Sequence, residues 1–181
     1  MQPQPVLLTR LPLLDEILEQ HSAPLGSDFV AYRNHAYRVA NFCCALAPSE
    51  SEDAISIAAA FHDIGIWTDR TFDYLEPSRR RARDWIDPSG HRGLGPLVDS
   101  MICEHHKVTR YRGPDGSLVE LFRQADRADV SVGLVAASIP RSFLSEVFGR
   151  FPNAGFHRLL LRQACRRFIQ HPLNPLPMMR W

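Results

Sequence analysis

The chain has 181 residues, of which 45% are hydrophobic, 23% charged and 9% aromatic. This composition is typical of one globular domain and argues against disorder or a coiled coil. With 21 Lys+Arg against 20 Asp+Glu the formal net charge is +1, so the overall charge does not favour nucleic acid or an anionic membrane as a partner. The four cysteines form no CxxC pair, and no apolar run approaches the ~18 residues of a membrane span. We therefore expect a cytoplasmic protein that binds neither nucleic acid nor membrane.

Proline interrupts both ends of the chain, and helical periodicity dominates between them. Residues 1–5 and 171–181 contain closely spaced prolines, so we expect these ends to be extended or loosely attached. After Ser27, apolar residues recur at steps of three and four, which predicts a helix over 27–46 with Ser27 as its cap. This helix carries His35 on its apolar face.

A second buried helix is predicted after Ser49. Ser49 and Glu52 have the spacing of a capping box, and small and apolar residues follow as far as His62. Gly65 then supplies the left-handed residue that commonly ends a helix. His62 and Asp63 are therefore predicted at the end of a buried helix.

Prolines and a turn mark the helices in the middle of the chain. Pro77 and Pro96 stand at positions typical of a first helical turn, and each predicts a helix. The GPDG sequence at 113–116 predicts a turn, and the apolar spacing after it predicts a helix over about 118–130. Asp126 lies on the apolar side of that helix, where an acid normally needs a partner.

The C-terminal helices are predicted at about 142–171. No alternating strand pattern competes with the helical one. We therefore predict an all-α protein, a single-domain helical bundle that covers residues 1–181. The last helix is a candidate surface for a homodimer.

Four side chains that bind metals well lie on these apolar faces: His35, His62, Asp63 and Asp126. Neutral imidazole nitrogens and carboxylate oxygens suit a divalent ion, and neighbouring residues can share one ion when they stand at a helix end. Alternatively, the two histidines are hydrogen-bonded core residues and Asp126 pairs with an arginine such as Arg38.

This pattern resembles the HD superfamily of metal-dependent phosphohydrolases, in which a lone histidine, an adjacent His-Asp pair and a later aspartate come from helices. The corresponding segments are YRNHAYRV, AFHDIGIW and QADRADV, and the resemblance covers about residues 28–130. It implies an HD-type helical bundle and a divalent ion (Zn, Mn, Fe, Ni, Co or Mg) held by His35, His62, Asp63 and Asp126. It also implies a hydrolase acting on a nucleotide or another small phosphorylated substrate through water activated by the metal, with Asp63 among the catalytic residues.

The residues after the His-Asp pair leave other functions open. Nucleotidases of this superfamily usually carry an acid just after the pair, whereas this chain has Ile66 and Trp67 and reaches an acid only at Asp69. The run FHDIG and the later histidine pair also resemble the cyanamide hydratase branch, whose members add water to a small nitrile. A third alternative is an HD domain that senses a nucleotide without turning it over.

The EHHK segment at 104–107 offers further candidates. In two-metal members of the superfamily, extra histidines between the pair and the last aspartate hold a second ion. His105 or His106 could therefore bind a second ion, act as a fifth ligand or transfer protons. His91 is another candidate, although one continuous helix would place it ~21 Å from His105.

Several cations are candidates for binding an anionic substrate. Arg38 lies one turn after His35, and Lys107 follows the histidine pair, so we predict that either could stabilise negative charge on a phosphoryl group. The run of Arg79, Arg80, Arg81 and Arg83 either contacts phosphate or forms a solvated helix face.

Overall fold

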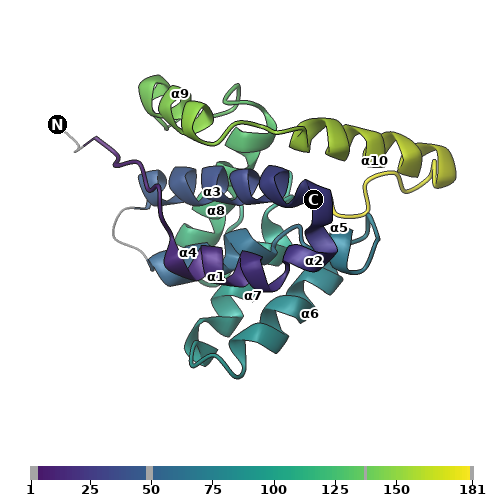
Figure 1. Cartoon of the computed structure of the whole chain (residues 1–181), viewed down its shortest axis with the longest axis horizontal. Coiled ribbons are helices and arrows are strands. Elements are labelled where there is room, and N and C mark those ends of the chain that lie inside the picture. Colours follow the sequence, from purple (N-terminus) through teal and green to yellow (C-terminus); the bar gives the residue numbers. More distant parts are fainter. Residues whose placement is uncertain (1–3, 48–50, 137, 180–181) are drawn as a thin grey trace.

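The computed structural model describes residues 4–47, 51–136 and 138–179. Within these ranges the chain forms helices and connecting turns with no strand, which confirms the all-α prediction (Figure 1). The α-helices are α1 (Pro12–Gln20), α2 (Ser22–Leu25), α3 (Phe29–Leu46), α4 (Glu52–Phe61), α5 (Gly65–Thr68), α6 (Leu75–Ile86), α7 (Gly95–Glu104), α8 (Gly116–Val130), α9 (Arg141–Arg150) and α10 (Phe156–Gln170). In the described ranges, no helix has the length and apolarity needed to cross a membrane.

Helix α3 is the centre of the bundle. It packs against α4, α8, α9 and α10, and its residues 31–43 are buried with the exception of Arg33 (Figure 1). A helix covered on so many sides buries polar as well as apolar side chains, and the buried polar ones need partners. His35 and Arg38 are two such side chains, and both find a partner on α8.

Helix α4 begins after Ser51, whose side-chain oxygen accepts a hydrogen bond from the Ala54 backbone N–H (3.3 Å). The predicted cap at Ser49 lies outside the described residues. Residues 54–61 are all buried, and the alanines among them allow α4 to pack closely against α1 and α3. The helix ends at Phe61, so the His-Asp pair stands in the turn that follows, as predicted.

Gly65 does not end a helix in the left-handed conformation, contrary to the prediction. Its φ is not positive, and it is the first residue of α5. A Cβ atom at Gly65 would lie 2.8 Å from the Tyr74 carbonyl oxygen and 2.9 Å from the Pro77 Cβ. Glycine is therefore needed because α5 and α6 approach each other closely just after the His-Asp pair.

The N-terminal third contains a helix that the sequence did not predict. Pro12 occupies the first turn of α1, a position that proline favours, and the helix buries Leu14, Ile17 and Leu18. A short 3-10 turn over Gly26–Asp28 then precedes α3, so the N-terminal residue of α3 is Phe29 and Ser27 is not its cap.

The C-terminal segment after α10 is attached more firmly than predicted. Met178 is 4% exposed and packs with Ile66, Tyr74 and Leu75. This contact brings the segment back to the body of the bundle beside α5 and α6 (Figure 1).

Candidate metal centre

Four side chains from different parts of the chain meet at one buried point. His35 comes from α3, His62 and Asp63 follow α4, and Asp126 comes from α8. His35 Nε2 lies 2.8 Å from His62 Nε2, 3.5 Å from Asp63 Oδ2 and 3.8 Å from Asp126 Oδ1. His62 Nε2 lies 3.7 and 3.8 Å from the same two oxygens, and all four side chains are at most 3% exposed. The fold thus brings together the four residues predicted as metal ligands.

Hydrogen bonds to the opposite ring nitrogens orient both histidines. His35 Nδ1–H donates to Asp129 Oδ2 (2.6 Å), and His62 Nδ1–H donates to the Ala59 carbonyl oxygen (3.0 Å). A carbonyl oxygen only accepts, so Nδ1 of His62 carries the proton and its Nε2 keeps a lone pair. Both Nε2 atoms therefore face the centre of the cluster, as they do in histidines held for metal binding.

The pKa values of the two histidines move in opposite directions. Burial lowers the pKa of His62 to about 3. Burial also lowers the pKa of His35, but hydrogen bonds to Asp129 and Asp63 outweigh this effect and raise the pKa to about 9. Near neutral pH, His35 Nε2–H therefore donates to the lone pair of His62 Nε2, 2.8 Å away. A proton therefore lies between the two Nε2 atoms, where the candidate ligand atoms converge.

The residues fit a bound cation. Three buried polar atoms here have no hydrogen-bond partner, whereas buried polar atoms normally have one. They are Asp63 Oδ1 and Asp126 Oδ1 of the cluster and Nε2 of the neighbouring His105. Nitrogen and oxygen ligands ~2.0–2.2 Å from a divalent ion lie roughly 3–3.5 Å apart in neighbouring coordination positions. The observed separations of 2.8–3.8 Å lie close to this range. His35, His62 and Asp63 could therefore hold a metal ion, with Asp126 beside them.

His105 and His106 extend the cluster from the end of α7. His105 Nδ1–H donates to the Ile102 carbonyl oxygen (2.7 Å), and its Nε2 faces Asp63 Oδ1 at 3.3 Å. Burial opposes protonation of this ring, but the carboxylates of Asp63 and Asp126 outweigh it and raise the pKa of His105. His106 Nε2 is hydrogen-bonded to the Tyr74 hydroxyl (2.6 Å), and its Nδ1 lies 3.8 Å from Asp126 Oδ2. Asp63, His105 and His106 form a second group that could hold an ion, and the two groups share Asp63.

Arg38 supports the cluster from behind and does not reach a substrate. Its fully buried guanidinium donates to both oxygens of Asp129 and to the carbonyl oxygens of Phe151 (3.0 Å) and Pro152 (3.3 Å). Because these bonds use its donors, the predicted role in stabilising substrate charge is corrected. Asp129, which the sequence reasoning missed, links Arg38 to the ring of His35. These bonds outweigh burial and lower the pKa of Asp129 to about 2.

His91 lies apart from the cluster. Its ring stacks on Trp85 with 5.8 Å between the ring centroids, and its Nδ1 lies 4.0 Å from Asp53 Oδ2. Neither group of possible metal ligands includes it. The suggestion that His91 binds a second ion is therefore corrected.

The arginine run on α6 pairs with carboxylates. Arg79 and Arg83 bind Asp99, whereas Arg80 and Arg81 bind Asp69. This arrangement favours a solvated helix face over a phosphate site. It also places Asp69, the first acid after the His-Asp pair, in ion pairs with arginines.

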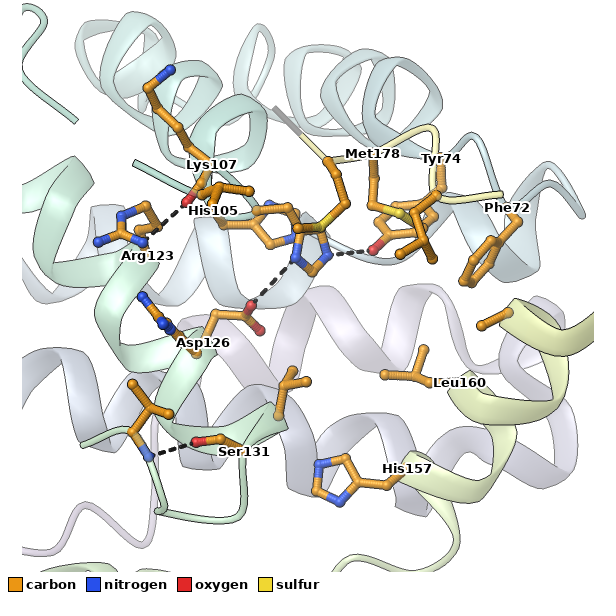
Figure 2. A pocket seen from close by; sticks show the side chains of 18 of the residues that line it. Phe72, Tyr74, His105, Lys107, Arg123, Asp126, Ser131, His157, Leu160 and Met178 are labelled. Carbon is orange, nitrogen blue, oxygen red and sulfur yellow. Dashed lines mark hydrogen bonds and ion pairs between the residues drawn. The ribbon is translucent and has the colours of Figure 1, made fainter. Parts of the chain in front are cut away.

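One edge of the cluster, formed by Asp126, lines a cavity of about 540 Å³, part of whose lining is drawn in Figure 2. His105, His106 and Asp126 contribute polar atoms to it, and Lys107 lies beside them. Arg123 also lines the cavity, but its guanidinium donates to the Glu120 carboxylate and to the Lys107 carbonyl oxygen. Most of the remaining lining is apolar and includes Phe72, Tyr74, Leu160 and Met178.

His157, near the start of α10, is a cavity residue that sequence reasoning missed. The Asn153 side-chain oxygen accepts from the His157 backbone N–H (3.2 Å), so its amide nitrogen donates to His157 Nδ1. The ring proton therefore lies on Nε2, which is buried without a hydrogen-bond partner and 3.8 Å from Asp129 Oδ2. The sequence carried no signal for this residue, because periodicity does not say which element the last helix covers.

The chain was compared with models of protein families, with curated proteins and with solved structures. None of the three comparisons gives a match. What the protein does must therefore be inferred from its own side chains.

Proposed function

We propose that the protein is a metal-dependent hydrolase that acts on a small phosphorylated substrate, as the resemblance to the HD superfamily implies. One observation carries the proposal: histidine Nε2 atoms and unpartnered carboxylate oxygens converge at a buried point, and Asp126 at this point lines a cavity of substrate size. A divalent ion bound there would activate water as a nucleophile and polarise a phosphoryl oxygen.

The ligand residues are His35, His62, Asp63 and Asp126. Asp129 and Arg38 hold the His35 ring in place, as outer partners of metal-binding histidines commonly do. His105 either joins this set or, with Asp63 and His106, holds a second ion.

Hydrogen bonding to the substrate is assigned to His106. Burial and the nearby carboxylates of Asp63 and Asp126 raise the pKa of Tyr74 well above its usual value, so its hydroxyl stays protonated and donates to His106 Nε2. The proton of the neutral ring then lies on Nδ1, toward Asp126. Burial lowers the pKa of His106, which keeps this neutral form at pH 7. His106 Nδ1–H can therefore donate to a substrate oxygen in the cavity, and Lys107 adds positive charge beside it.

A second candidate is a metal-dependent lyase that adds water to a small neutral molecule such as a nitrile. The apolar character of most of the cavity lining favours it, because an uncharged substrate loses less hydration on entering. A nucleotide-sensing domain without turnover is the remaining candidate.

The first experiment counts metal ions per chain by elemental analysis and measures phosphate release from a panel of phosphate esters. Wild type is compared with His62→Ala/Asp63→Ala and with His91→Ala, which removes a histidine outside the cluster. We expect one or two ions per chain and phosphate release in wild type and His91→Ala, and loss of both in the double variant. Conversion of nitriles without phosphate release would favour the lyase, and nucleotide binding without turnover would favour the sensor. Absence of metal after supplementation would contradict all metal-dependent candidates.

A further inference from the structure

The cavity beside the cluster has an unusual rim. Thirteen large apolar side chains are prominently exposed among the described residues, and six of them line this one cavity: Val108, Val130, Val135, Leu161, Leu176 and Met179. Scattered single apolar residues are normal on a protein surface, whereas a contiguous group around a cavity commonly marks a binding site.

The rim is built by segments that are distant in sequence. Val130 and Val135 lie at and after the end of α8, Leu161 lies on α10, and Leu176 and Met179 lie in the C-terminal segment. Inside the rim the cavity wall is formed by buried residues, among which Met178 packs on Tyr74. Tyr74 in turn contacts His106 of the cluster. The exposed rim is therefore mainly apolar, with Arg127 as its charged member, and the lining becomes polar toward His105, His106 and Asp126.

We propose that the substrate is amphiphilic: a phosphate monoester whose phosphoryl group sits at the cluster and whose hydrocarbon or aromatic body lies against α10 and the C-terminal segment. The identity of the head group rests on the proposed function. In hydrolysis, a water oxygen bonds to phosphorus and the phosphorus–oxygen ester bond breaks. The products are inorganic phosphate and an apolar alcohol, whose oxygen takes up a proton released by the water.

Two features favour a small molecule over a second copy of the chain as the occupant. The apolar residues surround a hollow of about 540 Å³, within the ~300–1,000 Å³ of small-molecule sites, rather than a flat patch. Asp126 and His105 also line the hollow, and each buries a polar atom without a hydrogen-bond partner, Oδ1 and Nε2, which a metal ion bound with an anionic head group would satisfy.

The test measures binding separately from turnover. Methyl-, butyl- and hexylphosphonate have a carbon–phosphorus bond in place of the ester, so they bind without being hydrolysed. Calorimetric titration into metal-supplemented protein should give a dissociation constant that falls about fourfold for each added methylene, the value expected for burial of a CH₂ group. Constants that agree within twofold across the series would overturn the proposal.

Matched double variants locate the apolar site. Leu161→Gln/Met179→Gln changes two exposed rim residues, whereas Ile169→Gln/Leu173→Gln changes two exposed residues of the same helix and segment outside the cavity. The rim variant should weaken hexylphosphonate binding at least tenfold and leave methylphosphonate binding unchanged, and the control should change neither. Equal effects of the two variants would contradict the assignment.

The outcomes separate this inference from the proposed function. A chain-length trend without phosphate release from the corresponding esters would support the apolar site and refute the hydrolase. Phosphate release with equal binding of all three phosphonates would support the hydrolase and refute the amphiphilic substrate. A dimer by light scattering that dissociates in the rim variant, with no chain-length trend, would show that the rim binds a second copy and would also refute it.

Discussion

Replacing Asp129 with alanine tests the support behind the metal cluster. Asp129 is fully buried, accepts a 2.6 Å hydrogen bond from His35 Nδ1 and binds the Arg38 guanidinium through both oxygens. Asp129→Ala leaves the Arg38 cation buried with only carbonyl partners. Removal of one member of a buried ion pair typically costs about 3–5 kcal/mol, and we expect the free energy of unfolding to fall by this amount.

Asp99→Ala is the matched control. Asp99 also binds an arginine through both oxygens, with bonds of 2.9 and 2.7 Å from Arg79, but the two side chains are 21% and 23% exposed. Solvent screens this pair in part, and Asp99 also pairs with Arg83, so its loss should cost about 1 kcal/mol, the upper end of the range for surface pairs. Urea denaturation of the metal-free proteins, followed by circular dichroism, gives both values. A loss in Asp129→Ala within 1 kcal/mol of the control would refute the reasoning.

The same variants should differ in metal affinity. Without Asp129 the His35 ring loses the partner that orients it, and loss of such outer contacts typically weakens metal binding by about 10–100-fold. Asp99→Ala should bind metal as wild type does. Titration with a competing chelator under conditions where both variants are folded gives the comparison. Equal affinities would mean that Asp129 stabilises the fold without positioning the ligand.

Three further predictions concern titration and local packing. The pKa of His35 is raised to about 9, and metal binding needs its Nε2 unprotonated, so metal affinity should rise about tenfold per pH unit between pH 6 and 8. The proton released on binding should be detectable by calorimetry in two buffers. A pH-independent affinity would contradict this prediction. Gly65→Ala should cost about 1–3 kcal/mol in thermal or urea unfolding, because its Cβ would clash with the Tyr74 carbonyl, whereas Gly149→Ala, in open space on α9, should not destabilise. Ser51→Ala should cost about 1 kcal/mol through loss of the α4 cap, and an unchanged urea midpoint would argue against that cap.

The candidate ligands could be predicted because each depends on local pattern. Helical periodicity placed His35 and Asp126 on buried faces, and the end of a buried helix placed His62 and Asp63 side by side. Sequence order then left little freedom, because α4 and α8 both pack against α3 at the centre of the bundle.

The supports of the site could not be predicted with the same ease, because they depend on which helices face each other. Asp129 lies three residues after Asp126, and Arg38 lies three residues after His35, so both pairs share a helix face. That spacing was a usable signal for the contact between α3 and α8. Without the contact itself, Arg38 was read as a substrate ligand.

Gly65 shows a different limit of sequence reasoning. A glycine after a helix usually indicates a left-handed residue, but here it reflects lack of space beside α6. Only the packing of α5 against α6 distinguishes a glycine needed for a left-handed conformation from one needed for lack of space. The N-terminal helix α1 was missed because the closely spaced prolines before it suggested an extended end. Pro12 is nevertheless well placed in the first turn of the helix.

The way α10 is attached has a consequence for how ligands enter and leave. Of the described residues of α10, Phe156 at its start is the one that is buried, and the chain is next fixed to the body at Met178. The outer wall of the cavity is thus fixed at Phe156 and Met178, with Leu160 partly buried between them and much of the rest exposed. It can open by local fluctuation, at a free-energy cost well below that of global unfolding, while α3 and the ligand cluster stay packed. Phe156 stacks on the His35 ring with 4.0 Å between the ring centroids, so the fixed start of α10 is tied to the candidate metal ligands, whereas the exposed part of the wall lies beyond this contact.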